Sequence, residues 1–254
     1  MVDDDSIVRF FHKHLVPMLF TVQENGVSRQ FIITAFVLSV DDHWFLVTAG
    51  HCLRDIETLK ANGAKIISCA LIDRMGEGAK YVENIPFAYE NAIPVYLSNE
   101  LEYDYGVIAL SGYYRQLLET NNIKPLTEEV WDLQPDKFDF YKLIGIPYEL
   151  LEITPDYINL TSTLFDVEPL NDLPNGVEKL SSPQFIGKIT LSGGLQNIEG
   201  TSGGPIFGFY ENPPGTLKYW LLALQSRWLP TSQIVIGCPT KLLGQFLRSR
   251  ILKS

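Results

Sequence analysis

The sequence predicts an all-β protein, either a sandwich or a barrel, with a helix near each end of the chain. Short β-prone runs make up most of the chain, and Gly, Pro and Asn residues separate them. A short amphipathic pattern near the start and a clearly helical last segment supply the two terminal helices. With 254 residues, the chain is long enough to bury a large core without disulfides or metal.

The N-terminal segment, residues 5–15, predicts a short amphipathic helix. Asp5 or Ser6 can cap this helix, and Pro17 ends it. Its apolar residues recur on one side, and they are Ile7, Val8, Phe10, Phe11 and Leu15.

Strands follow the N-terminal helix, and polar turns mark their ends. Glu24-Asn25-Gly26 is a hairpin signal, and Asp41-Asp42-His43 predicts a second turn. The predicted strands are 18–23, 31–40, 45–48, 65–72, 95–97, 105–110, 141–146, 187–191, 205–209, 220–225 and 234–237.

The remaining segments separate or close the β-rich regions. Two stretches, 73–93 and 147–185, predict long loops or insertions, and a helix-like or linker region at 112–135 divides the chain into two β-rich halves. Thr240 can cap a C-terminal helix, whose apolar stripe consists of Leu242, Leu243, Phe246, Leu247 and Ile251.

Composition excludes several functions. Lys and Arg number 20 against 30 Asp and Glu, and this net charge of −10 argues against a nucleic-acid partner. No apolar run reaches the roughly 18 residues of a membrane span, so we expect no membrane partner. The acidic start of the chain does not resemble a secretion signal, so we expect a cytoplasmic protein.

The cysteines and histidines do not form a metal site in the sequence. Cys52, Cys69 and Cys238 contain no C-x-x-C pair, and this odd, sparse set predicts free thiols. None of the four histidines lies at ligand spacing from a cysteine, so we expect neither a metal nor another cofactor.

The strongest chemical signal is Gly200-Thr201-Ser202-Gly203-Gly204-Pro205. Glycines on both sides of a serine allow a tight turn that exposes the hydroxyl. They also let backbone N–H groups converge beside it as an oxyanion hole. The alternative is a glycine-rich turn that contains an incidental serine.

A serine nucleophile needs a base and an acid that orients the base. His51 follows a β-prone run, where a strand end can hold an imidazole at the edge of a cleft. Asp104 begins an apolar strand, where its carboxylate needs a donor such as an imidazole N–H. If His51 stood alone, a hydrogen-bonded histidine in a turn would be the default interpretation.

Three blocks of the sequence resemble the signature blocks of trypsin-like (chymotrypsin-fold) serine proteases. They are Thr48-Ala49-Gly50-His51-Cys52, Asp104-Tyr105-Gly106-Val107-Ile108-Ala109-Leu110 and the segment 200–205. Their order, His then Asp then Ser, is the chymotrypsin order. Segments 143–147, 223–228 and 236–240 are similar to later strands of this family, and the chain is most similar to bacterial-type domains without disulfides.

The resemblance implies two packed six-stranded antiparallel Greek-key β-barrels, with a short N-terminal helix and a C-terminal helix. The implied divisions are an extension at 1–16, a first barrel at 17–120 and a second barrel at 121–254 that carries the insertion at 147–185.

The implied activity is that of a serine endopeptidase acting on a polypeptide substrate. Ser202 would attack the scissile carbonyl, His51 would transfer the proton, and Asp104 would orient His51. The N–H groups of Gly200 and Ser202 would form the oxyanion hole, and Ser226 would lie near Asp104. The alternative function is a peptide-binding module of the same fold with little turnover.

The chain also departs from the family pattern. Cys52 lacks its usual partner, because Thr34 and Ala35 stand where that cysteine would be, so we expect a free, buried thiol. Thr201 replaces the aspartate that pairs with a newly cut N-terminus in zymogens. Regulation would then come from the 147–185 insertion or from a protein partner.

Substrate specificity is less strongly predicted. Gln196 lies six residues before Ser202, at the position that sets basic specificity in trypsin, and it predicts no preference for Lys or Arg. Arg227 could favour an acidic substrate side chain or could point into solvent, and Trp228 could narrow the cleft.

Overall fold

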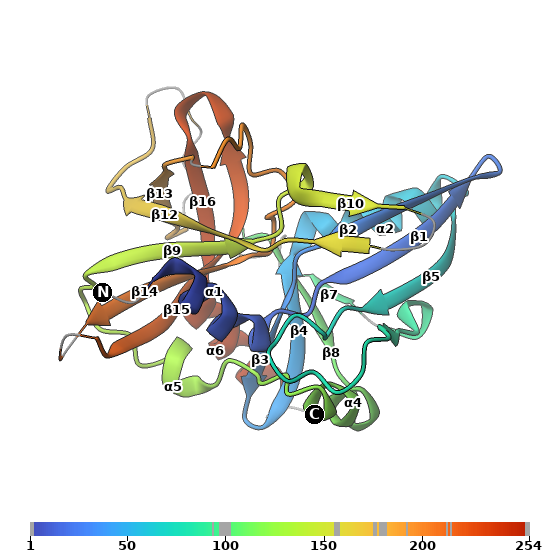
Figure 1. Ribbon diagram of the computed structural model, residues 1–254, viewed down its shortest axis with the longest axis horizontal. Helices are drawn as coiled ribbons and strands as arrows, with labels where there is room; N and C mark the ends of the chain where they lie inside the picture. The colour runs from blue at the N-terminus through green and yellow to red at the C-terminus, as the bar shows by residue number, and fades with distance from the viewer. Residues whose placement is uncertain are drawn as a thin grey trace.

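A computed structural model describes residues 3–92, 94–96, 103–154, 158–174, 177, 182–191, 193–211, 213 and 215–251. The described chain is mostly β-structure, as predicted, and its two halves lie side by side (Figure 1). The strands of the first half are β1 (Met18–Glu24), β2 (Val27–Ile33), β3 (Phe36–Val40), β4 (His43–Ala49), β5 (Lys65–Leu71), β6 (Ile85–Pro86), β7 (Pro94–Tyr96) and β8 (Tyr105–Ala109).

The strands of the first half form two four-stranded sheets, in the orders β2-β1-β5-β6 and β3-β4-β8-β7. Both predicted turns are confirmed, and their central residues Asn25, Gly26, Asp41 and Asp42 have the positive φ angles of tight hairpins. Side chains from the two sheets pack into one core, which includes Phe20, Leu71, Val37, Leu46 and Ile108.

The second half contains a closed six-stranded barrel in the order β12-β13-β16-β15-β14-β9. Its strands are β9 (Phe140–Gly145), β12 (Thr163–Pro169), β13 (Phe185–Ile189), β14 (Pro205–Glu211), β15 (Leu217–Leu229) and β16 (Ile234–Pro239). One closed barrel is therefore confirmed. Two packed barrels are not confirmed, because the first half forms two sheets, and the boundaries at 1–16, 17–120 and 121–254 stay predictions.

The expectation of a long loop at 147–185 is wrong for the described residues between 148 and 169, where most residues lie in regular elements. The chain forms η3 (Tyr148–Leu150), a hairpin of β10 (Leu151–Ile153) and β11 (Ile158–Leu160), and then the barrel strand β12. Apolar side chains of the hairpin pack with Leu19, Ile32 and Ile72 of the first half. This segment therefore connects the two halves through a shared apolar cluster.

The helices are short and lie around the sheets. They are α1 (Asp4–Phe11), η1 (His12–His14), α2 (Gly50–Ala61), η2 (Tyr89–Asn91), α4 (Gly112–Thr120), α5 (Glu128–Trp131), η4 (Pro230–Ser232) and α6 (Thr240–Ile251). The predicted terminal helices are confirmed, and α4 and α5 occupy the predicted helix-like region at 112–135. The helix α2, which follows β4 directly, was not predicted.

The N-terminal helix packs on the barrel of the second half (Figure 1). Its N-cap is Asp3, whose carboxylate accepts a hydrogen bond from the Ser6 N–H, so the prediction of Asp5 or Ser6 as the cap is wrong. The Phe11 ring contacts Phe207 of β14 at 4.3 Å between ring centroids. The buried Lys142 of β9 donates to the carboxylate of Asp4 at 2.8 Å.

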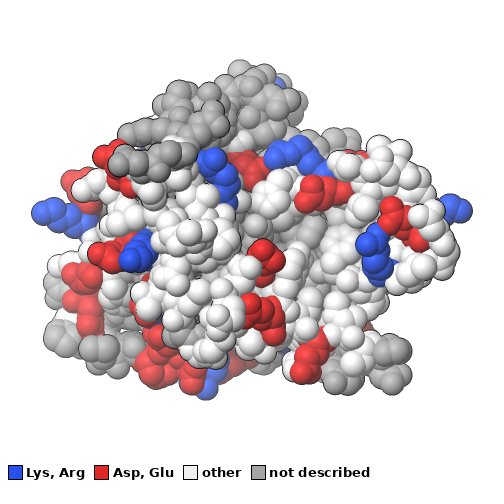
Figure 2. Space-filling model, turned by 90° about the horizontal axis from the view of Figure 1, so that it is seen from above, with Lys and Arg blue, Asp and Glu red and all other residues white. Residues whose placement is uncertain are grey.

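The surface matches the acidic composition. On the face shown in Figure 2, acidic side chains cover more area than basic ones, and the basic side chains occur in separate small groups. Within the described part of the chain, no helix combines the length and apolar character needed to cross a membrane.

Candidate active site

Strand pairing brings His51 and Asp104 together. Strands β4 and β8 pair so that Ala49, the last residue of β4, lies opposite Tyr105, the first residue of β8. His51 therefore lies in the first turn of α2, just beyond the end of β4, while Asp104 immediately precedes β8. The two residues meet although 53 positions separate them in the sequence.

The His51 ring is bonded to the Asp104 carboxylate. The Nδ1 atom of His51 lies 2.6 Å from Oδ2 of Asp104, and the backbone N–H of His51 donates to Oδ1 at 2.7 Å. An ionised carboxylate only accepts hydrogen bonds, so Nδ1 carries the proton and Nε2 of a neutral ring is left as an acceptor. This tautomer is the one that a general base facing Ser202 requires.

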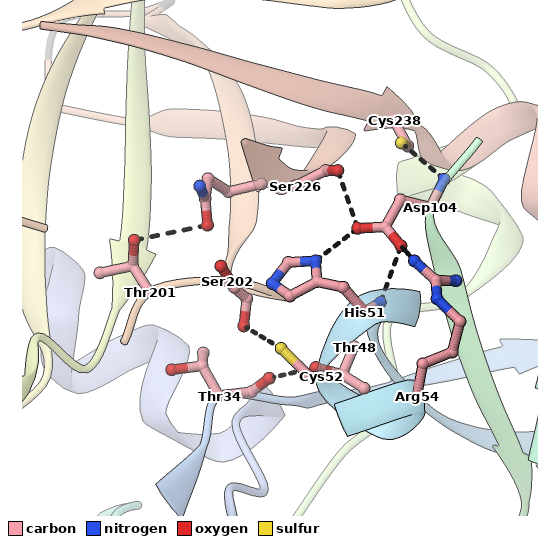
Figure 3. A network of polar contacts seen from close by, with 11 residues as sticks. Thr34, Thr48, His51, Cys52, Arg54, Asp104, Thr201, Ser202, Ser226 and Cys238 are labelled. Carbon is pink, nitrogen blue, oxygen red and sulfur yellow. Dashed lines mark hydrogen bonds and ion pairs between the residues drawn. The ribbon is translucent and has the colours of Figure 1, made fainter. Parts of the chain in front are cut away.

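Two further side chains donate to the same carboxylate. Arg54, one turn along α2, donates through Nη2 to Oδ1 of Asp104 at 2.7 Å, and the Ser226 hydroxyl donates to Oδ2 at 3.0 Å. The backbone N–H of Asp104 donates to the sulfur of Cys238 at 3.3 Å. The carboxylate is thus fixed from several directions (Figure 3).

These contacts shift the pKa values of both groups. Burial disfavours charge on Asp104, but the hydrogen bond and charge of His51 and the hydrogen bonds from Arg54 and Ser226 outweigh it and hold the pKa of the carboxyl below its ordinary value. Burial also disfavours charge on His51, but the hydrogen bond with Asp104 raises the pKa of the ring above its ordinary value. The acid is therefore ionised, and the ring binds its second proton readily.

A β-bulge directs Ser226 toward Asp104. The pairing of β15 with β16 shifts register between Gln225 and Arg227, so that Ser226 is the extra residue on its strand. A bulge re-aims the side chain of the extra residue, which here meets a carboxylate from the other half of the chain. The predicted proximity of Ser226 and Asp104 is present in the structure.

Ser202 lies on the opposite side of the His51 ring from Asp104 (Figure 3). Both Ser202 and His51 line a cavity of about 390 Å³. The cavity walls come from both halves of the chain, including Thr34 from the first half and Tyr148 and Trp228 from the second. The three predicted residues therefore meet where the halves join.

Internal hydrogen bonds hold the loop around Ser202. The buried Thr201 hydroxyl donates to the Ile198 carbonyl at 2.8 Å, and the Gly203 N–H donates to the Gln225 carbonyl at 2.8 Å. The Thr34 hydroxyl, from the first half, donates to the Gly200 carbonyl at 2.8 Å. These bonds hold the loop in place around Ser202.

Two positions in this loop require glycine. Gly200 and Gly203 have φ angles of +97° and +90°, which side chains rarely adopt. A Cβ atom at Gly200 would lie 2.6 Å from the Ile146 carbonyl oxygen, and one at Gly203 would lie 2.5 Å from the Thr34 carbonyl oxygen. Both the backbone conformation and the close packing of the loop therefore depend on these glycines.

The backbone N–H groups of Gly200 and Ser202 flank the side chain of the candidate nucleophile. Within the described residues, neither group donates a hydrogen bond to the protein. Two free donors beside a serine hydroxyl can bind an oxygen that becomes negatively charged. These are the two residues that the sequence predicts for an oxyanion hole.

Of the other predicted substrate residues, two lie beside the site and one does not. Arg227 and Trp228 line cavities next to His51. Gln196 lines neither cavity, and it is exposed, with its N–H bonded to Glu149 at 3.0 Å and its side chain bonded to the Gly194 carbonyl. The structure therefore does not bring Gln196 to the site.

Sequence reasoning missed Arg54 and the role of Thr34. Arg54 lies three positions after His51, a spacing that places both on one face of a helix, but α2 was not predicted. Thr34 contacts Gly200 across 166 positions, and no local signal marks such a contact.

The cysteines are free thiols, as predicted. Cys52 is half-buried rather than buried, and its sulfur lies 3.9 Å from the Ser202 carbonyl oxygen. Among the residues that the structure describes, no group of three or more His, Cys, Asp or Glu side chains could hold a metal ion.

No protein-family model matches the chain, and no curated protein matches its sequence. The fold is similar to that of a thermostable serine protease, AL20, from an extremophilic microorganism. That match has 17% identity and a TM-score of 0.51, and it covers 94% of this chain and 98% of the other. The fold is also similar to that of the scabies mite inactivated protease paralogue S-I1. That match has 16% identity and a TM-score of 0.53, and it covers 94% of each chain.

These matches identify the fold. The chain has the trypsin-like protease fold that the three sequence blocks predict. Identities of 16% and 17% do not support a particular subtype, so the similarity to bacterial domains without disulfides stays a prediction. One of the two similar proteins is an inactivated protease, so activity must be argued from the site rather than from the fold.

Proposed function

We propose that the protein is a serine endopeptidase that cuts polypeptides through a Ser202–His51–Asp104 triad and an acyl-enzyme intermediate. The observation that carries this proposal is the 2.6 Å contact between Nδ1 of His51 and the Asp104 carboxylate, with Ser202 on the other side of the ring. A hydrogen-bonded histidine in a turn would need neither the acid nor the serine.

The chemistry follows from the positions of these groups. Nε2 of His51 accepts the Ser202 proton while the hydroxyl oxygen attacks the carbonyl carbon of the substrate. The free N–H groups of Gly200 and Ser202 bind the carbonyl oxygen as it gains negative charge. His51 then donates the proton to the leaving amine, and a water molecule hydrolyses the acyl-enzyme by the same steps.

The loop geometry favours turnover over a purely binding role. A module that only holds peptides has no need for two unpaired N–H groups beside a serine hydroxyl. The bonds of Thr201 to the Ile198 carbonyl hold the loop in place, and they support a loop that is ordered for catalysis. We further propose a cytoplasmic location and regulation through the 147–185 segment or a protein partner.

Two measurements on the folded protein and on the Ser202→Ala variant test the function. A fluorophosphonate probe should label the native protein and not the variant, and a diverse peptide pool should be cut by the native protein alone. Binding of peptides by both proteins, without labelling or products, would instead identify a peptide-binding module. The Ser111→Ala variant, which changes a serine at the start of α4, serves as the matched control and should retain labelling.

A further inference from the structure

A second cavity lies on the Asp104 side of the His51 ring. Its volume is about 620 Å³, and its walls include Arg54, Arg227, Gln184 and Trp228. It shares His51 and Trp228 with the cavity that contains Ser202, so a peptide bound at Ser202 can reach it.

The charged residues in the walls of this second cavity favour an anion. Arg54 and Arg227 are cationic, and Asp104 is the acidic residue in the walls. The Asp104 carboxylate is already bonded to His51, Arg54 and Ser226. In the described part of the chain, Arg227 has no ion pair or hydrogen bond of its side chain, so its charge is uncompensated.

Unpaired donors are concentrated in the same walls. Nη1 of Arg54, Nη2 of Arg227 and Nε1 of Trp228 are enclosed and have no hydrogen-bond partner among the described residues. All three atoms are donors, and an enclosed donor without a partner costs free energy.

We propose that this cavity binds an acidic side chain, Asp or Glu, of the polypeptide substrate at a position flanking the cut bond. A carboxylate offers two acceptor oxygens to a guanidinium fork, and it compensates the charge of Arg227. The proposal rests on the proposed function, and it specifies the class of substrate for the same site.

Because the protein carries a net charge of −10, general attraction of acidic peptides does not explain a preference for them. A preference for Glu over Gln would have to come from local groups, and Arg227 is the cation in these walls without a partner. Screening by salt would then weaken the preference.

The test compares peptides that differ only by Glu against Gln, or Asp against Asn, at each position around the cut bond. At one position, we expect kcat/KM for the acidic peptide to exceed that for its amide by about ten-fold. The ratio should approach one in Arg227→Gln and should favour a Lys peptide in Arg227→Glu. The Arg29→Gln variant, on the β1–β2 hairpin, is the control and should keep the native ratio.

Circular dichroism and thermal unfolding show whether each Arg227 variant folds, and Arg227→Lys provides a second, milder change. A folded native protein that cuts Glu and Gln peptides equally, or a ratio that Arg227→Gln leaves unchanged, would overturn the proposal.

If neither cutting nor probe labelling occurs, the proposed function fails, and peptide binding to Ser202→Ala still tests this cavity. Fluorescence polarisation should then show tighter binding of the Glu peptide, and equal or undetectable binding of both peptides would also overturn the proposal.

Discussion

Replacing Arg54 by Met should raise the pKa of His51. Arg54 and His51 share one carboxylate in this site, since Arg54 Nη2 lies 2.7 Å from Oδ1 of Asp104 and His51 Nδ1 lies 2.6 Å from Oδ2. The guanidinium charge disfavours a second positive charge on the ring. Its removal also leaves the Asp104 carboxylate more available to the imidazolium.

The magnitude follows from Coulomb's law. Two unit charges roughly 6 Å apart interact by about 3 kcal/mol at an effective dielectric constant of about 20. The side chains of Arg54 and His51 are 41% and 37% exposed, so water screens much of this interaction. We therefore expect the pKa of His51 to rise by about 0.5 to 1 in Arg54→Met.

The sign of the effect on activity is fixed by the mechanism. General-base catalysis needs the neutral ring, which is the form above the pKa of His51, so activity falls as the pH drops through that pKa. A higher pKa in Arg54→Met moves the acidic limb of the kcat/KM profile to higher pH. The same limb should stay in place in Arg29→Met, whose arginine pairs with Glu24 on the β1–β2 hairpin.

The dependence of kcat/KM on pH is measured for the native protein, Arg54→Met and Arg29→Met. An NMR titration of the His51 ring gives its pKa independently of turnover. A purely structural role of Arg54 would lower kcat/KM equally at all pH values. An acidic limb that stays in place, or that moves to lower pH in Arg54→Met, would refute the electrostatic argument.

Three further changes probe the site and the fold. Ser226→Ala removes the 3.0 Å hydrogen bond to Asp104, and we expect kcat/KM to fall about ten-fold with little change in Tm; an unchanged kcat/KM would contradict this role. Gly203→Ala places a Cβ atom 2.3 Å from Thr48 Oγ1 at a φ angle of +90°, and urea unfolding should show a loss of about 2 to 3 kcal/mol. Phe11→Ala empties a fully enclosed site between α1 and the barrel, and the same measurement should show a loss of about 3 kcal/mol, whereas a loss below about 1 kcal/mol would mean that the helix does not anchor on the barrel.

The sequence predicts much of the fold because hairpins and buried strands carry local signals. The turns at Asn25-Gly26 and Asp41-Asp42 need residues that tolerate positive φ, and such residues are visible in the sequence. The strand β12 was missed because it is flanked by segments rich in Pro, Asp and Asn. Its inward Phe165 and Val167 alternate with outward Asp166 and Glu168, a short amphipathic pattern inside an otherwise polar stretch.

The candidate site was predictable where three sequence blocks identify its residues. The blocks that contain His51, Asp104 and Ser202 each stand beside a strand, and sheet pairing then brings the first two together. Arg54 was missed because the helix α2 starts directly after β4, where the sequence was interpreted as the end of a strand. Gln196 was placed by counting back from Ser202, and counting does not reproduce the path of the loop before that residue.

Ser226 and Arg54 both donate to the Asp104 carboxylate, but they act on the site in different ways. A carboxylate that orients an imidazole must stay ionised, and each added hydrogen-bond donor lowers the pKa of that carboxyl further. The same close contact with the ionised carboxylate raises the pKa of the imidazole ring. Ser226 stabilises the ionised carboxylate without adding a charge, whereas Arg54 adds a positive charge that opposes protonation of His51. We expect the charge of Arg54 to offset part of the rise in the pKa of His51 that Asp104 causes, and the Arg54→Met titration measures this contribution. A residue outside the three sequence blocks is therefore expected to shift the acidic limb of the kcat/KM profile.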